Sequence, residues 1–149
     1  MATGKTNARW IKVLVEPLSA TAQVDISADV TNIQQFGLRH EETDVTGYSN
    51  GVINFTLGHP ESPIVLSGVL NNTATTGSHV VLSALEGNQA KTSTVTIQIG
   101  IKATPTSTDP EFEGEFYCSE YVLSGDNGVT WSARFVPASS AVPAWGTVA

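Results

Sequence analysis

The clearest pattern in the sequence is a strict alternation of apolar and polar residues near the C-terminal end. Between residues 129 and 135 every second residue is apolar, namely Val129, Trp131, Ala133 and Phe135. The residues between them are polar, namely Thr130, Ser132 and Arg134. Side chains of a strand alternate between its two faces, so this pattern predicts a strand with one buried face. We expect Trp131 in the core, with Val129 and Phe135 beside it.

A second alternating segment precedes this strand and predicts its hairpin partner. One face carries Phe112, Gly114, Phe116 and Cys118, and the opposite face carries Glu113, Glu115 and Tyr117. The alternation slips near Ser119–Glu120, after which Tyr121 and Leu123 take the apolar positions. Such a slip indicates a β-bulge, because one extra residue returns the apolar side to the core. The segment 124–128 contains Asn-Gly, which favours a tight turn, so residues 112–136 are predicted to form a β-hairpin.

Other β-rich segments predict further strands. They are residues 10–16, 24–33, 52–57 (ended by Gly58-His59-Pro60), 64–70 and 91–103. Residues 75–87 form the best helix candidate, with Thr75 or Ser78 as N-cap and Gly87 at its end. A buried strand over residues 79–85 is the alternative. The order of elements predicts a mainly β protein: a β-sandwich or small β-barrel with one short flanking α-helix.

Two segments carry few apolar residues. Residues 34–49 are predicted to form an extended hairpin arm or an irregular loop, and residues 1–8 a flexible N-terminal arm. A segment with so little apolar surface does not offset its own ordering entropy. We therefore expect the 34–49 segment to be mobile in a free subunit and ordered against a neighbour. No repeat or boundary divides residues 9–149, which are predicted to form a single β domain.

Composition points to a surface partly covered by other subunits. Only 14% of the 149 residues are charged, below the roughly 25% of typical soluble domains. The simpler alternative is a Thr-rich β-sandwich that is monomeric. The net charge is −7 and the seven Lys and Arg residues are scattered, which argues against binding a nucleic-acid backbone.

Cysteine usage and hydropathy bear on the compartment. The single Cys118 excludes an internal disulfide and is interpreted as a small buried apolar residue. No apolar run reaches membrane-spanning length, and residues 1–10 contain no signal-peptide core. The expectation is a protein made in the cytoplasm and not exported by that route, without a membrane partner.

The search for catalytic or metal-binding residues yields no site. The three histidines, His40, His59 and His79, lack metal-ligand spacing. Ser78 and His79 are neighbours on one segment without the glycine pattern of a nucleophile elbow. Glu113 and Glu115 share a strand face, but an outward acidic strand explains them better than a carboxylate pair. We therefore expect no enzyme activity, no metal and no cofactor.

The order of several segments resembles that of the tail tube (major tail) proteins of long-tailed bacteriophages. The matching segments are an acidic, Thr-containing arm (41–49), a strand pair (52–57 and 64–70), a short helix (77–85), closing strands (112–116 and 128–135) and the Trp145-Gly146-Thr147-Val148 ending. The resemblance implies a structural virion protein of the phage tail, made in the host cytoplasm. Six subunits would form a ring, and rings would stack into a tube through which double-stranded DNA passes without specific binding. The implied partners are further copies of the chain and other phage tail proteins.

This resemblance also suggests which residues take part in assembly. The subunit-interface candidates are Gln34, Phe36, Leu38, Val45 and Tyr48. The candidates for a lumen or acidic face are Glu41, Glu42, Asp44, Glu113 and Glu115. An acidic lumen fits the net charge, because negative charge repels DNA phosphates.

Two other classes remain open. One is a phage capsid decoration (cementing) protein, whose ordering N-terminal arm would be residues 1–8. The other is a carbohydrate-binding β-sandwich, which would need exposed aromatic residues on one sheet face. Aromatic residues are only 7% of the chain and most lie at core positions of strands, so this class ranks last.

Overall fold

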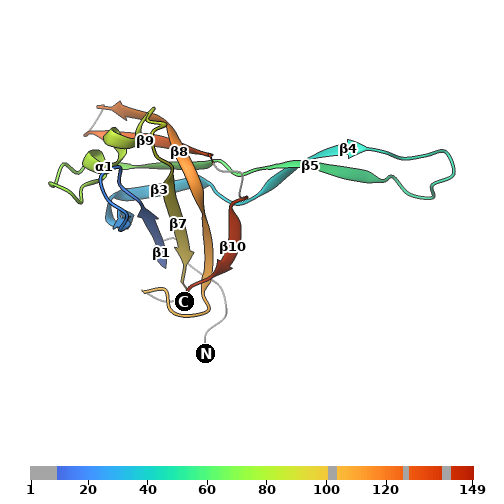
Figure 1. Ribbon diagram of the computed structural model, residues 1–149, viewed down its shortest axis with the longest axis horizontal. Helices are drawn as coiled ribbons and strands as arrows, with labels where there is room; N and C mark the ends of the chain where they lie inside the picture. The colour runs from blue at the N-terminus through green and yellow to red at the C-terminus, as the bar shows by residue number, and fades with distance from the viewer. Residues whose placement is uncertain (1–9, 101–103, 126–127, 139–141) are drawn as a thin grey trace.

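The computed structural model describes residues 10–100, 104–125, 128–138 and 142–149. They form a mainly β body from which a two-stranded hairpin projects (Figure 1). The elements in order are β1 (Ile11–Val15), β2 (Val24–Asp25), the 3₁₀ helix η2 (Ser27–Asp29), β3 (Val30–Gln35), β4 (Arg39–Asp44), β5 (Phe55–Glu61), β6 (Ile64–Val69), α1 (Ser78–Leu85), β7 (Ser93–Ile99), β8 (Pro110–Ser124), β9 (Thr130–Pro137) and β10 (Ala144–Thr147). The predicted flexible arm at residues 1–8 lies outside the described residues, and the single-domain boundary stays a prediction.

Strand β8 joins the two halves of the body. The antiparallel sheet runs β2-β1-β7-β8-β9-β6-β3, and β10 pairs with β8 as well. Residues 111–116 of β8 pair with β7, whereas residues 116–124 pair with β9. The sheet bends across this change of partner, so that β7 and β9 run in different directions in Figure 1. The result is an open, sandwich-like fold and not a closed barrel, because the two terminal strands of the sheet, β2 and β3, do not pair with each other.

The core lies between the two halves of the sheet. Phe112, Phe116, Trp131 and Phe135 are completely or almost completely buried, together with apolar residues of β1, β6 and β7. The predicted bulge is confirmed, because the register of β8 with β9 shifts between Cys118 and Glu120. The inward alternation of Trp131, Ala133 and Phe135 is confirmed too.

Two residues assigned to the buried face are exposed. Val129 is 45% exposed and Leu123 is 44% exposed, although their neighbour Trp131 is buried. Leu123 pairs with Trp131 near the end of the hairpin, where the alternation continues but no element covers the last side chains. The prediction that Val129 packs beside Trp131 in the core is therefore wrong. Residues 126–127 of the predicted turn lie outside the described residues.

Helix α1 is confirmed, but its cap differs from the prediction. Its N-cap is Gly77, and no side chain of the N-cap bonds to the helix. Instead, the Asp29 carboxylate of η2 accepts hydrogen bonds from the Ser78 backbone N–H at 3.3 Å and from the Asn71 side chain at 3.1 Å. A carboxylate there complements the positive end of the helix dipole. Asp29 thus ties the helix to the β3 side of the sheet, across 49 residues of sequence.

The alternative of a hairpin arm, and not an irregular loop, is confirmed in part for the 34–49 segment, because residues 39–44 form β4 of a hairpin whereas residues 34–35 belong to β3 of the main sheet. Strand β4 pairs only with β5 in a separate two-stranded sheet. The predicted strand over residues 52–57 has different bounds, because β5 begins at Phe55 and runs through Gly58-His59-Pro60 to Glu61. A two-stranded hairpin tolerates Pro60 since one edge of each strand has no partner. We call residues 38–61 the arm.

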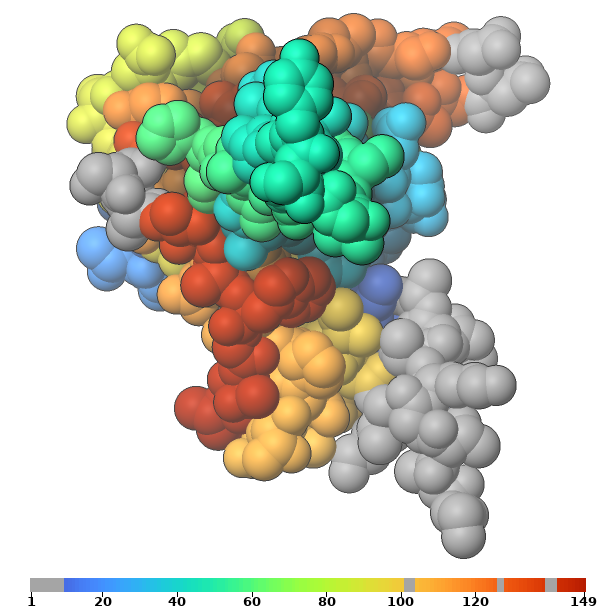
Figure 2. Space-filling model, turned by 90° about the vertical axis from the view of Figure 1, so that its right-hand side faces the viewer, coloured from blue at the N-terminus to red at the C-terminus, as the bar shows by residue number. Residues whose placement is uncertain are grey.

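An aromatic cluster fastens the arm at its base. The ring of Trp145 in β10 lies 5.9 Å from Phe36, just before the arm, and 5.0 Å from Phe112 in the core, between ring centroids. Gly37 follows with a φ of +113°, a conformation that favours glycine. Figure 2 shows β10, in red, directly below the projecting arm. The C-terminal strand therefore helps to set the direction in which the arm leaves the body.

Candidate assembly interface

The arm carries large apolar side chains that no described part of the chain covers. All of β4 is exposed, and all of β5 except the half-buried Pro60. The exposed apolar residues are Leu38, Val45, Tyr48, Val52, Ile53, Phe55 and Leu57. Isolated two-stranded hairpins are marginally stable in water, and exposed apolar patches mark interaction sites. The arm is therefore a candidate for contact with another molecule.

One face of the arm is half acidic and half apolar. In the antiparallel register Glu42 lies opposite Leu57, and Asp44 lies opposite Phe55, so that these four side chains share one face. Hydrogen bonds from the side chain and backbone of Thr46 lower the pKa of Asp44, which therefore stays ionised at neutral pH. A partner for this face needs apolar surface together with a positive charge.

The predicted interface residues fall into three places. Gln34 is exposed in β3, at the edge of the main sheet. Phe36 is half-buried and packs against the core at the base of the arm. Leu38, Val45 and Tyr48 are exposed on the arm. The structure thus brings three of the five candidates together on the arm, and it assigns Phe36 a supporting position.

Four apolar residues of the arm were missed as interface candidates. They are Val52, Ile53, Phe55 and Leu57, which the sequence pattern placed in a body strand. Pairing of β5 with β4 puts them in the arm. No local signal distinguishes this segment, because Ile53, Phe55 and Leu57 alternate with Asn54 and Thr56 as they would in a strand with one buried face.

A row of glutamates forms the second candidate surface. Glu111, Glu113 and Glu115 lie on the outer face of β8, and β7 supplies a hydrogen-bond donor to each. Gln98 donates to Glu111 at 2.9 Å, Thr96 to Glu113 at 3.2 Å, and Thr94 to Glu115 at 2.5 Å. We call this row the acidic face. It contains the predicted Glu113 and Glu115, whereas Glu41, Glu42 and Asp44 lie apart from it on the arm. Sequence reasoning missed Glu111.

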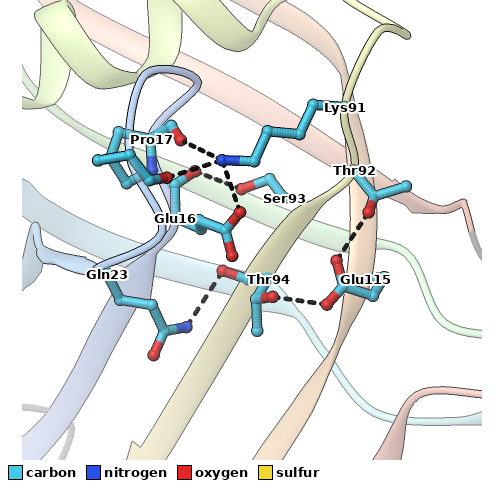
Figure 3. Close-up of polar contacts among 9 residues, drawn as sticks. Glu16, Pro17, Gln23, Lys91, Thr92, Ser93, Thr94 and Glu115 are labelled. Carbon is cyan, nitrogen blue, oxygen red and sulfur yellow. Dashed lines mark hydrogen bonds and ion pairs between the residues drawn. The ribbon is translucent and has the colours of Figure 1, made fainter.

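The end of the acidic face is tied to the loop after β1 (Figure 3). Thr92 donates a second hydrogen bond to Glu115 at 2.9 Å. The neighbouring Lys91 ammonium bonds to the carbonyl oxygens of Pro17 and Ala20 and lies 2.8 Å from the Glu16 carboxylate. An ammonium has three hydrogens to donate, so these three partners saturate it. Lys91 therefore has no donor left to neutralise the acidic face.

Glu113 is the carboxylate that the fold disfavours in its charged form. Partial burial raises its pKa above the ordinary 4.5, the hydrogen bond from Thr96 opposes this rise, and the nearby Glu111 and Glu115 add to it. A raised pKa means that the folded state gains stability when Glu113 is protonated and loses it as pH rises through the folded-state pKa.

We expect Glu113→Gln to melt slightly higher than the parent at pH 7, because a neutral amide avoids this charge penalty and still accepts from Thr96. The difference should shrink as pH falls below 4.5, where the parent side chain is itself protonated. Thermal melts between pH 3.5 and 7.5 measure this. A variant that melts lower than the parent at pH 7 would contradict the sign.

Little in the described ranges suggests chemistry at another site. No group of three His, Cys, Asp or Glu side chains there is placed to hold a metal ion. None of the described helices is long and apolar enough to cross a membrane. Burial raises the pKa of Cys118 to about 11, so the thiol stays protonated at neutral pH. The His79 ring lies 2.9 Å from the Tyr121 hydroxyl and packs beside its ring.

Comparison with known proteins identifies the fold. No protein-family model matches the sequence, and no curated protein matches it. Solved structures do match. A chain in the tail of an empty gene transfer agent particle, refined with C6 symmetry, is 14% identical with a TM-score of 0.65, over 97% of this chain and 100% of that chain. A chain of the cap that terminates the tube of the anti-feeding prophage is 10% identical with a TM-score of 0.66, over 99% and 95%.

A third match comes from an extracellular contractile injection system. A chain of its sheath/tube terminator in the extended state is 13% identical with a TM-score of 0.64, over the full length of both chains. At such low identity these matches speak for the fold alone. The chain therefore has the fold found in the tails and tubes of phage-like particles, and the resemblance noted in the sequence is confirmed at that level.

Proposed function

We propose that the protein is a structural subunit of a phage or phage-like tail, which assembles into stacked rings that form the tail tube. The observation that carries this proposal is the arm, which extends from the body and presents uncovered apolar side chains. A lone subunit would leave this surface in water, whereas a second copy would cover it. The shared fold with chains of tail and tube assemblies supports the same assignment.

The sheet supplies the edges that a ring requires. Strand β3 ends the sheet on one side, and the two-residue β2 ends it on the other. Unpaired edges at two different places on one molecule allow head-to-tail contacts, which generate rings when the rotation closes. We propose six copies in each ring, as the resemblance implies.

The acidic face supports a passage for DNA. The carboxylates of Glu111, Glu113 and Glu115 lie in a row, and their hydrogen-bond donors come from the neighbouring strand β7. Carboxylates lining a lumen would repel phosphates and keep DNA from adhering. We propose that this face lines the tube, and that the protein acts without catalysis or a cofactor.

Electron microscopy and sedimentation of the purified chain test this function. We expect rings or tubes as the protein concentration rises from micromolar to near-millimolar. Monomers throughout this range would contradict the proposal. Trimers without tubes would favour the capsid decoration protein instead.

A further inference from the structure

The outer face of the second half of the sheet differs sharply from the acidic face. It is formed by β6, β9 and the C-terminal half of β8, and its cross-strand rows are Val65–Arg134–Glu120, Ser67–Ser132–Val122 and Val69–Thr130–Ser124. Only Arg134 and Glu120 in these rows are charged. We call this surface the serine–valine face. Val122 is 53% exposed, and a shallow groove of about 350 Å³ runs beside it between Ser67, Thr130 and Ser132.

Among the described basic residues of the body, Arg134 is the one without an ion pair, so it can meet a carboxylate of another molecule. Among the described basic residues, Lys91 bonds to Glu16, Lys12 lies 3.9 Å from Asp25, and Arg39 belongs to the arm itself. Within the same ranges Arg134 forms no ion pair. Glu120 lies opposite it in the register without forming one.

The properties of the serine–valine face complement those of the arm. The arm presents Phe55 and Leu57 beside Glu42 and Asp44 on one face. The serine–valine face offers apolar Val122 and a groove beside the positive Arg134. The acidic face would repel the same carboxylates. The groove between α1 and the loop 17–24 offers apolar lining, but its nearest cation, Lys91, is already saturated.

We infer that the serine–valine face receives the arm of a second copy, with Phe55 and Leu57 against Val122 and with Arg134 facing Glu42. This inference rests on the proposed self-assembly and names the receiving surface. The contact is heterologous, since the arm and its seat are different parts of the chain, so each copy can give one arm and receive another.

A charge swap tests the pairing. Arg134→Glu should raise the concentration at half-assembly by about tenfold or more, because it places like charges opposite each other. Glu42→Arg should do the same, and both residues are exposed. The double variant should return to within about threefold of the parent, since the pair is restored with reversed signs.

A matched control separates this pair from a general effect of charge. The double variant Glu42→Arg with Lys12→Glu has the same net charge as Glu42→Arg with Arg134→Glu. It should not restore assembly. Thermal melts of dilute protein check that each variant is folded. If Arg134→Glu unfolds, Arg134→Gln replaces it, and we expect a smaller rise in the concentration at half-assembly.

The outcomes also separate this inference from the proposed function. If the parent assembles and Arg134→Glu assembles equally well, or if the double variant is not rescued, the inference is overturned and the function stands. A parent that never assembles overturns both.

Discussion

Removal of the arm is expected to leave a folded subunit that no longer assembles. The variant replaces residues 41–59 with Asn-Gly, a favoured two-residue hairpin turn, and it keeps the pairs Arg39–Glu61 and His40–Pro60. The body should survive because none of the exposed arm residues belongs to the buried core. The aromatic contacts of Phe36, Trp145 and Phe112 also remain.

Sedimentation and electron microscopy across the concentration range of the parent measure this result. Two smaller changes locate the effect on one face of the arm. Phe55→Ser with Leu57→Ser should also abolish assembly, whereas Thr43→Ser with Thr56→Ser, on the opposite face, should preserve it. Tubes formed by the shortened chain would refute a role of the arm in assembly.

The free arm is also expected to be mobile, which hydrogen exchange can measure. Amides of residues 42–57 in monomeric protein should exchange much faster than those of β9, because the arm forms a separate two-stranded sheet with exposed side chains. Equal protection in both segments would show that the arm is ordered without a partner.

Trp131→Ala is expected to lower the free energy of unfolding by about 3–5 kcal/mol, the range for a large aromatic removed from a core. The Trp131 side chain is only 2% exposed and packs beside Tyr121. Its indole N–H donates to the Val69 carbonyl at 2.8 Å, a bond that alanine would lose. Gly68 lies directly beneath, since a Cβ there would come within 2.7 Å of the indole. A close-fitting site of this kind leaves a cavity when the ring is removed.

Denaturant titration of the arm-shortened chain gives this value without interference from assembly, which would add apparent stability. Val129→Ala is the matched control from the same strand pattern. Its side chain is 45% exposed and lies outside the buried core, so we expect a change within about 0.5 kcal/mol. If Trp131→Ala unfolds at the denaturant concentration of the parent, the indole does not support the core.

Local patterns in the sequence predicted the parts of the fold that have one buried face. The alternation at Trp131, Ala133 and Phe135 and the slip at Ser119 each follow from neighbouring residues, so the hairpin and its bulge were predictable. Val129 continues the same alternation, but it lies near the end of the hairpin, where its side chain is exposed. The alternation alone does not show where burial ends. Asp29 caps the helix from 49 residues away, a contact that no local pattern signals.

The arm was harder to predict for a different reason. Strand β5 has no buried face, so the hydrophobic pattern gave no correct boundary, and Gly58-His59-Pro60 resembled a strand end. Its position depends on the register with β4, which shifts between His40 and Glu42. The acidic face was predicted in part. Glu113 and Glu115 alternate with Phe112, Gly114 and Phe116, whereas Glu111 precedes the first apolar residue of this alternation.

The position of β8 has a consequence for biosynthesis. The ribosome makes the chain from the N-terminus, and β1 must wait for β7, whose paired residues lie 80 to 88 positions later, before its main partner exists. Strands β3 and β6 can pair earlier, but they join β1 only through β7, β8 and β9. Such distant pairings fold slowly and leave strand edges open meanwhile. We therefore expect nascent chains that end before β8 to need chaperone protection, although the arm is already complete in them.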